Sequence, residues 1–311
     1  MVEDNEIKAQ VSPFAIREGE IKTFDGKDGY VSMNQIVHKI NIGHINEIHF
    51  AILDLVNEFE FITSRQLYQM LEIKGFDPKS QDKLNNKLEQ LVKSKILTRY
   101  YFTSDEGKGI YRIYCLEKMG KYLLNSKEID CKWQPSDNTK PVPMIKKRLA
   151  GNQTLIAYLR KVKAFDSYIV KPAITAKVTG KLFKASGGAV KLTKNNKSIQ
   201  FVFEVIRREQ DWEKKLVERM RLYKDFYENY VLGDSGFSSM PQLILVCEDE
   251  KHMAETFKEI VKNQVEIPQI KLYFTTDLRQ NKETLEETLV EFKLVDGKYR
   301  MENVELKLLG M

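Results

Sequence analysis

Glu204 is the carboxylate whose surroundings come closest to a catalytic pattern. It lies in an apolar run, "SIQFVFEVI" (198–206), that is followed by the charged and aromatic stretch "DWEKKLVERMRLYKDFY" (211–227). The apolar run predicts a strand, and the longer stretch, with apolar residues at helical spacing, predicts a helix. A carboxylate at a strand end beside a basic helix can hold Mg²⁺ at a phosphodiester, which is the chemistry of metal-dependent hydrolysis.

The elements that must position this glutamate follow one another in a recognisable order. A helix over 144–162 precedes a strand at "SYIVK", a lysine-rich segment to Lys197, the strand and helix around Glu204, the strand "PQLILVCE", a helix near "KHMAETFKEIV" and the strand "IKLYFTT". A closing hairpin is expected at "FKLVDGKYRM". This alternation predicts a mixed-sheet α/β sandwich over 144–311, and its α-β-β-β-α-β order resembles the restriction-endonuclease-like fold.

That resemblance implies a metal site which the residues of this chain leave incomplete. The fold uses an Asp on one strand and Glu-x-Lys or Asp-x-Lys on the next, but Ile206 occupies the lysine position here. Ala173 occupies the position of the first acid, and Asp166 lies at the start of its strand. Lys214 or Lys215, on the following helix, is a candidate to replace the lysine that is missing at position 206. We therefore expect an inactive nuclease-like domain with no catalytic residue and no metal ligand.

Two structural interpretations compete with a functional one around this glutamate. A buried Glu204 would be stabilised by pairing with Arg207 or Arg208, which offsets the cost of burying its charge. The apolar and aromatic residues of the following helix predict a core face rather than a base-stacking platform. These residues are Trp212, Leu216, Met220, Tyr223, Tyr227 and Tyr230. No GxGxxG or Walker A loop and no metal-binding histidine spacing is present, so no cofactor is expected.

The interval 167–203 has an unusual charge pattern. It contains seven lysines and no acidic residue. The phosphate backbone of a nucleic acid is the natural partner of a segment whose charges are all positive, because lysines neutralise phosphates and release their counterions. The alternative is a loop that lysine keeps soluble. The candidates for DNA contact in this interval are Lys177, Lys181, Lys184 and Lys191.

The first half of the chain predicts three helices followed by a hairpin. Apolar residues recur at helical spacing over 45–59, and Thr63 and Gln66 have the spacing of a capping box at the start of a second helix. "KSQDKLNNKLEQLVKSKIL" (79–97) predicts the third helix, and "ILTRYYFTS" and "IYRIYCLE" flank a glycine-containing turn. This order is typical of a winged helix, which we place at 41–130. Residues 1–40 are expected to form an extended arm and 131–143 a linker.

The third helix of this half carries its polar residues on the face opposite its leucines. Cations there suit phosphates, and Asn or Gln can bond an adenine edge in the major groove. The alternative is a winged helix that contacts protein through an ordinary solvated face. The candidate DNA-binding residues are Lys79, Lys83, Asn86, Gln90 and Lys93 on the helix, with Arg99, Lys108 and Arg112 on the wing.

The composition limits the class of protein but does not indicate a function. Hydrophobic residues make up 42% and charged residues 30% of the 311 residues, which suits packed domains, and the net charge of +6 permits a polyanionic partner. The three cysteines are widely spaced, so a disulfide framework and a CxxC zinc site are both excluded. No leader pattern or apolar stretch of membrane-spanning length is evident. We expect two cores and a cytoplasmic location.

The combination of a winged helix with a nuclease-like domain resembles the replication-relaxation proteins of plasmids and other bacterial mobile elements. The resemblance rests on the winged-helix pattern, the strand end "FEVIR", the helix "KLVERMRLY" and the strand "PQLILVCEDEKH". It implies a non-catalytic protein that binds double-stranded DNA in plasmid replication, DNA relaxation or transfer. A replication initiator or relaxase would be its partner, and a homodimer is compatible with this role. Members of this family often have acids where Ala173 and Ile206 stand here.

Two other functions are kept as alternatives. A winged-helix transcriptional regulator would bind near a promoter as a dimer. A Mg²⁺-dependent DNA nuclease would use Glu204 with Asp166 and would lose cleavage on Glu204→Gln.

Overall fold

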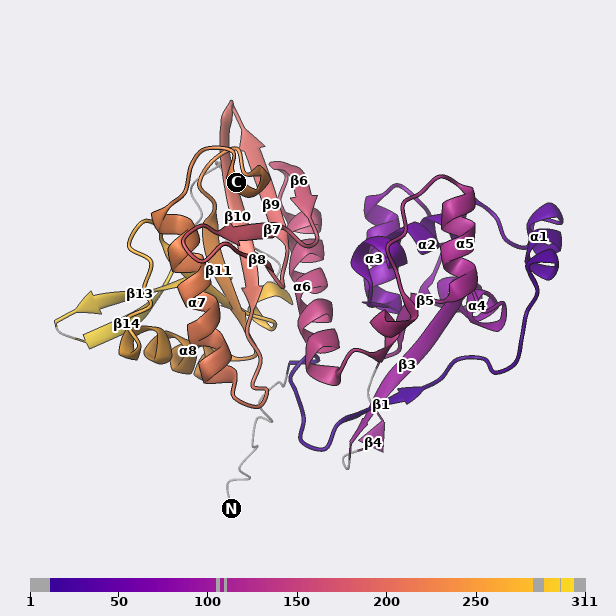
Figure 1. Ribbon diagram of the computed structural model, residues 1–311, viewed down its shortest axis with the longest axis horizontal. Helices are drawn as coiled ribbons and strands as arrows, with labels where there is room; N and C mark the ends of the chain where they lie inside the picture. The colour runs from indigo at the N-terminus through magenta and orange to yellow at the C-terminus, as the bar shows by residue number, and fades with distance from the viewer. Residues whose placement is uncertain (1–11, 105–106, 109–110, 282–287, 297, 305–311) are drawn as a thin grey trace, which may run out of the picture.

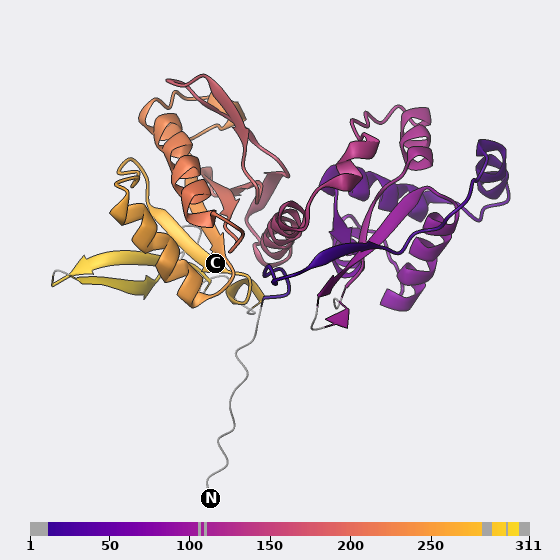
Figure 2. The same cartoon turned by 60° about the horizontal axis from the view of Figure 1, so that its bottom comes forward.

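The protein is a mixed α+β structure with a small and a large sheet. The computed structural model describes residues 12–104, 107–108, 111–281, 288–296 and 298–304 (Figure 1). One sheet has five strands and the other, which is mixed, has seven. We call residues 21–126 the small lobe and residues 165–303 the large lobe. Figures 1 and 2 both show helix α6 lying between the two lobes. No helix in these ranges is both long and apolar enough to cross a bilayer.

The small lobe contains the predicted helices and hairpin. Its elements are β1 (Ile21–Phe24), α1 (Met33–Asn41), α2 (Glu47–Phe59), β2 (Ile62–Thr63), α3 (Ser64–Ile73), α4 (Gln81–Lys93), β3 (Leu97–Ser104), β4 (Gly107–Lys108), β5 (Ile113–Leu116) and α5 (Lys118–Ser126). The predicted capping box is confirmed, because Thr63 and Gln66 bond each other's backbone N–H at the start of α3. β3 pairs antiparallel with β5, as the predicted hairpin requires.

Residues 12–24 of the segment expected to be an extended arm are folded onto both lobes, and residues 1–11 lie outside the described part. β1 pairs antiparallel with β3, so it adds a strand to the small sheet. Upstream of β1, Glu20 forms an ion pair with the buried Lys146 of α6. Further upstream, the Ser12 hydroxyl donates to Asp277, which follows β12 in the large lobe. Residues 12–24 therefore connect three parts of the structure, and we call them the N-terminal strap.

The stretch expected to be a linker is also ordered. It contains the short 3₁₀ helix η1 (Pro135–Thr139) and leads into α6 (Val142–Lys161). Asn138 Nδ2 donates to the Leu116 carbonyl at 2.8 Å, and Trp133 Nε1 donates to Asn138 Oδ1 at 3.1 Å. Lys22 of β1 donates to the Asn138 carbonyl at 2.5 Å. These bonds hold 133–138 against the small sheet, so the two lobes are not joined by a free tether.

Helix α6 is packed on two sides. On the side of the small lobe, Gln66 Nε2 donates to the Leu149 carbonyl at 2.8 Å, and Asn152 Nδ2 donates to the Phe61 carbonyl at 2.7 Å. On the side of the large sheet, the rings of Tyr158 and Phe203 lie 4.9 Å apart. One cluster of buried side chains consequently runs from the small lobe through α6 to the large sheet. Two cores are therefore present among the described residues, as expected, but they do not correspond to the two lobes, because the second cluster lies on the opposite face of the large sheet.

The large lobe follows the predicted order with one insertion. Its elements are β6 (Phe165–Ile169), β7 (Ala173–Ala176), β8 (Lys181–Lys184), β9 (Ala189–Lys194), β10 (Lys197–Val205), α7 (Trp212–Glu228), η2 (Asp234–Gly236), β11 (Gln242–Cys247), α8 (Glu250–Lys262), β12 (Leu272–Thr276), η3 (Arg279–Asn281), β13 (Val290–Val295) and β14 (Lys298–Asn303). The sheet order is β14-β13-β12-β11-β10-β9-β6, and β10 is antiparallel to β9 and parallel to β11. β7 and β8 form a separate hairpin. The closing hairpin is confirmed as β13–β14.

A buried ion pair holds the strap to the large lobe. Arg207, which follows β10, is fully buried and donates two bonds to the Asp277 carboxylate at 2.8 and 2.9 Å. Its Nη1 also donates to the Ile206 carbonyl at 2.8 Å. Because the Ser12 hydroxyl donates to the same carboxylate, the strap and two strand ends meet at this charge pair.

Asp277→Ala should strongly destabilise the protein. It leaves the Arg207 guanidinium buried without its carboxylate, which typically costs about 3–5 kcal/mol of unfolding free energy. Urea denaturation followed by circular dichroism measures this loss. Asp130→Ala is the control, because the Asp130 side chain is 78% exposed and its ion pair with Lys132 spans 3.7 Å. Equal losses in the two variants would contradict the role assigned to this pair.

Candidate nucleic-acid interface

Helix α4 has the predicted division between a buried and an exposed face. Ser80 caps its start by accepting from the Lys83 backbone N–H at 3.2 Å. The leucine face packs into the core through Leu84, Leu88, Leu91 and Val92. The five polar residues singled out from the sequence are all exposed, namely Lys79, Lys83, Asn86, Gln90 and Lys93.

Local bonds divide these five polar residues into two groups. Lys79 pairs with Asp77 at 2.5 Å, Lys93 pairs with Glu89 at 3.6 Å, and Gln90 Oε1 lies 3.2 Å from His49 Nε2. In contrast, the side chains of Lys83 and Asn86 have no hydrogen bond or ion pair within the described ranges. Of the five candidates, these two are the side chains that a ligand can engage without breaking an existing bond.

The wing differs from expectation at Arg99. Its guanidinium lies 2.6 Å from Glu89 and 3.0 Å from Asp25, and its side chain is only 16% exposed. Asp25 also pairs with the more exposed Arg112 at 2.6 Å. Two carboxylates therefore neutralise Arg99, and we remove it from the candidate interface. For Lys108 the structure describes the backbone, which lies in β4 opposite Thr103, while its side chain is outside the described part.

The lysine-rich interval is folded and not a solvated loop. Its β7–β8 hairpin buries Ile174 and Phe183 against α7. Asp225 of α7 accepts from the backbone N–H groups of Val178 and Thr179 at the hairpin turn, at 3.0 and 3.2 Å. The lysines of this hairpin are consequently presented from a fixed backbone.

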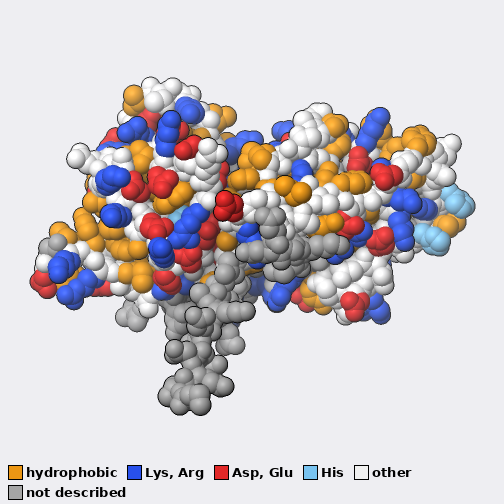
Figure 3. Space-filling view, turned by 90° about the horizontal axis from the view of Figure 1, so that it is seen from below, with side chains coloured by type: hydrophobic (Ala, Val, Ile, Leu, Met, Phe, Trp, Pro, Cys, Tyr) orange, Lys and Arg blue, Asp and Glu red, His pale blue; other side chains and the backbone are white. Residues whose placement is uncertain are grey.

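Ion pairs again separate the candidate lysines. Lys177 pairs with Asp234 at 2.6 Å, and Lys191 pairs with Asp166 at 3.2 Å. Lys181 and Lys184 of β8 are exposed, and their ammonium groups form no ion pair with any described residue. Basic and acidic side chains are interspersed on the face that Figure 3 presents, so charge alone does not mark an interface there.

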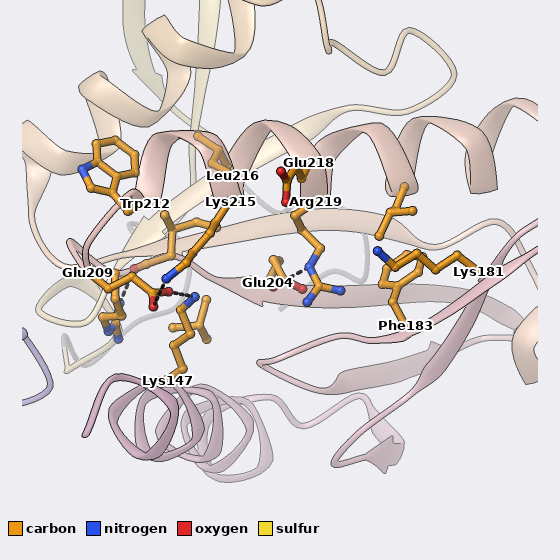
Figure 4. Close-up of a pocket in the computed structure, with 14 residues that line it drawn as sticks. Lys147, Lys181, Phe183, Glu204, Glu209, Trp212, Lys215, Leu216, Glu218 and Arg219 are labelled. Carbon is orange, nitrogen blue, oxygen red and sulfur yellow. Dashed lines mark hydrogen bonds and ion pairs between the residues drawn. The ribbon is translucent and has the colours of Figure 1, made fainter. Parts of the chain in front are cut away.

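Glu204 lies beside a cleft of about 270 Å³ that is lined by residues of α6, β8, β10 and α7 (Figure 4). Its carboxylate accepts from the Tyr223 hydroxyl at 2.8 Å and from the Ser186 hydroxyl at 3.0 Å. Arg219 Nε lies 3.5 Å away. The predicted pairing with Arg207 or Arg208 was wrong. Arg207 binds Asp277, as described above, and Arg208 binds Asp249 and Glu255 instead.

Arg219 is the residue of this cleft that sequence reasoning missed. It lies three residues after Leu216 and four before Tyr223, both of which are buried, so helical spacing places it on the core face of α7. The predicted core role of that face is confirmed, with Trp212 and Tyr230 at its partly buried ends. An arginine at a core position of an amphipathic helix is a signal that a buried carboxylate lies opposite.

The structure does not bring Asp166 to Glu204. Asp166 is exposed and pairs with Lys191, which lies opposite Gln200 on β10, four residues before Glu204. Lys215, one of the two proposed substitutes for the missing lysine, instead pairs with Glu209 at 2.7 Å. Across the described ranges, no group of three or more His, Cys, Asp or Glu residues is arranged to hold a metal ion.

The ionisable groups of the cleft are tuned by burial and by neighbouring charge. Burial raises the pKa of Tyr223 well above its usual value, and the negative charge of Glu204 raises it further. Tyr223 therefore stays a hydrogen-bond donor to Glu204. For Glu209, burial favours a higher pKa, but hydrogen bonds from Lys147 and Lys215 outweigh it and the pKa is lowered. Glu209 is therefore ionised at neutral pH.

Comparison with known proteins adds little to this geometry. No family model matches the chain, and no curated protein matches it. One similar solved structure is that of the restriction endonuclease FokI, with 9% sequence identity and a TM-score of 0.25. The match covers 74% of this chain and 42% of that one, so this chain spans less than half of it. A likeness at this TM-score carries no argument, and the resemblance to replication-relaxation proteins stays a hypothesis.

Tyr223→Phe should destabilise the protein by about 1.5–3 kcal/mol, because it removes a hydrogen bond to a buried charged group. The control is Tyr122→Phe, since Tyr122 on α5 is 44% exposed. Thermal and urea unfolding of both variants measure the difference. An unchanged stability of Tyr223→Phe would show that Ser186 and Arg219 alone satisfy Glu204.

Proposed function

We propose that this protein binds double-stranded DNA without cleaving it, through the exposed face of α4 and the lysines of β8. The observation that carries the proposal is the pair Lys83 and Asn86, which are exposed and unbonded within the described ranges on the helix that precedes the β3–β5 hairpin. In a winged helix this helix enters the major groove, where a lysine suits a phosphate or guanine and an asparagine suits adenine.

The large lobe would add contacts to the DNA backbone. Lys181 and Lys184 lie on a strand whose turn is held by Asp225, and their charges are not neutralised by a described carboxylate. Such contacts neutralise phosphates whatever the sequence, while the small lobe selects the site.

The non-catalytic part of the proposal is supported by the surroundings of Glu204. Its carboxylate is engaged by Tyr223, Ser186 and Arg219, and Asp166 lies elsewhere on the sheet. A metal-dependent nuclease requires at least one further ligand at this point. Cleavage of duplex DNA by the full chain in Mg²⁺ would overturn this part.

The sequence resemblance favours a role in plasmid replication, relaxation or transfer, with a replication initiator or relaxase as partner. Fluorescence-anisotropy titration of the full chain on plasmid-origin, transfer-region, promoter and random duplexes tests this role. Selective binding to origin or transfer DNA supports it, and selective binding to promoter DNA would instead identify a transcriptional regulator.

The double variant Lys83→Ala/Asn86→Ala should weaken binding to the preferred duplex by roughly 1–3 kcal/mol for each side chain that bonds a base edge in the wild type. Binding to random duplex should change much less. The control is Lys251→Ala, which removes one charge from α8, where Lys251 is 84% exposed. If the double variant and the control bind the preferred duplex as tightly as the wild type does, α4 is not the recognition helix.

Lys181→Gln/Lys184→Gln should reduce the slope of log Kobs against log salt by about 1.8, because each phosphate contact contributes roughly 0.9. The matched control is Lys177→Gln/Lys191→Gln on the same segment. The ammonium groups of these two lysines already pair with Asp234 and Asp166, so the slope should change little. Similar slopes for the two double variants would contradict the assignment of β8 to the DNA backbone.

A further inference from the structure

The cleft beside Glu204 carries more positive than negative charge. Its lining includes five cations and three carboxylates, and because Arg207 is paired with Asp277 outside the lining, four cations remain against three carboxylates. The cations are Lys147, Lys181, Arg207, Lys215 and Arg219, and the carboxylates are Glu204, Glu209 and Glu218. Arg207 is fully buried and committed to Asp277. The other four cations come from α6, β8 and α7 and surround the cleft (Figure 4).

Two of these cations are incompletely bonded. Arg219 pairs with Glu204 through Nε, but its Nη1 is buried and has no hydrogen-bond partner in the described structure. The guanidinium lies over the Phe183 ring, 5.2 Å from its centroid, where it makes a cation–π contact. Lys181, two residues before Phe183, contributes an ammonium group without an ion pair to any described carboxylate. A guanidinium and an ammonium group lining one cleft match the oxygens of a phosphate.

The walls of the cleft strengthen the attraction of its cations for an anion. Phe183, Val205, Ile206, Leu216 and Leu222 line it with apolar surface. Cations in a concave site with partly apolar walls attract anions more strongly than cations on an open surface do. The volume of about 270 Å³ accommodates a phosphate group together with part of the molecule that carries it.

We propose that this cleft binds a phosphate group, with Arg219 and Lys181 as its first ligands and Lys215 as a third. Glu209 acts as an internal competitor, because its carboxylate lies between Lys147 and Lys215 and bonds both ammonium groups. An entering phosphate takes Lys215 from Glu209. The source is either a DNA backbone or a separate phosphorylated ligand, and the DNA source rests on the proposed function.

The test is isothermal titration of the full chain with inorganic phosphate at constant ionic strength, using chloride as the balancing anion. Lys181→Gln should weaken phosphate binding about fivefold, because it removes a charge-assisted bond. Glu209→Gln should strengthen binding by about the same factor, since it frees Lys215. The control is Lys251→Gln, which removes an exposed charge from α8 outside the lining of the cleft, and it should leave phosphate binding unchanged.

The proposal is overturned if phosphate produces no saturable binding, if Lys181→Gln and Lys251→Gln behave alike, or if Glu209→Gln fails to strengthen binding. Lys83 and Asn86 lie outside the cleft, so phosphate binding should be the same in Lys83→Ala/Asn86→Ala as in the wild type. The phosphate titration therefore tests the cleft independently of the proposed DNA function. Adding duplex DNA to the phosphate-loaded protein identifies the source. Displacement of phosphate assigns the cleft to the DNA backbone, and retention assigns it to a separate phosphorylated ligand.

Discussion

Helix α6 must satisfy two packed surfaces at the same time, and the arrangement of both lobes depends on this requirement. Leu149 and Asn152 meet the small lobe, and Tyr158, between one and two turns beyond Asn152, meets the large sheet. At Gly151 any side chain would collide with the loop before β9, since a Cβ atom would lie 2.6 Å from the Ser186 carbonyl oxygen. That loop supplies the Ser186 hydroxyl to Glu204. The packing of α6 therefore also sets the position of a group in the cleft.

Charge is distributed by a simple rule across the large lobe. Buried charges are matched by specific partners, as Arg207 is by Asp277 and Glu204 is by Tyr223, Ser186 and Arg219. A buried charge without its partner would lose its hydration with nothing to compensate the cost in free energy. Exposed lysines are under no such constraint, so those that remain without a described partner are available to a ligand. The proposed binding surfaces use such lysines together with Asn86, one under-bonded arginine and Lys215, which pairs with Glu209.

Local patterns were sufficient to predict much of the fold. Helical spacing predicted α2, α4 and α7, the capping spacing of Thr63 and Gln66 predicted the start of α3, and alternating runs predicted the β3–β5 and β13–β14 hairpins. The failures involve pairs that are distant in the chain. Arg99 meets Asp25, and Glu204 meets Arg219 only after a strand and a helix have packed. Periodicity reports which face is buried, but it does not identify the charge on the opposing element.

The strap has a consequence for how the chain reaches this structure. Ser12 and Asp277 are separated by 265 positions in the sequence, so their bond is among the most non-local contacts of the fold. During synthesis the small lobe, including β1, can assemble early because all its strands lie between residues 21 and 116. Docking of the first strap residues must wait until β12 has emerged from the ribosome, and such late closure is slow. Until then the Arg207 guanidinium lacks the Asp277 carboxylate. The nascent large lobe is therefore the part of the chain most exposed to misfolding and proteolysis.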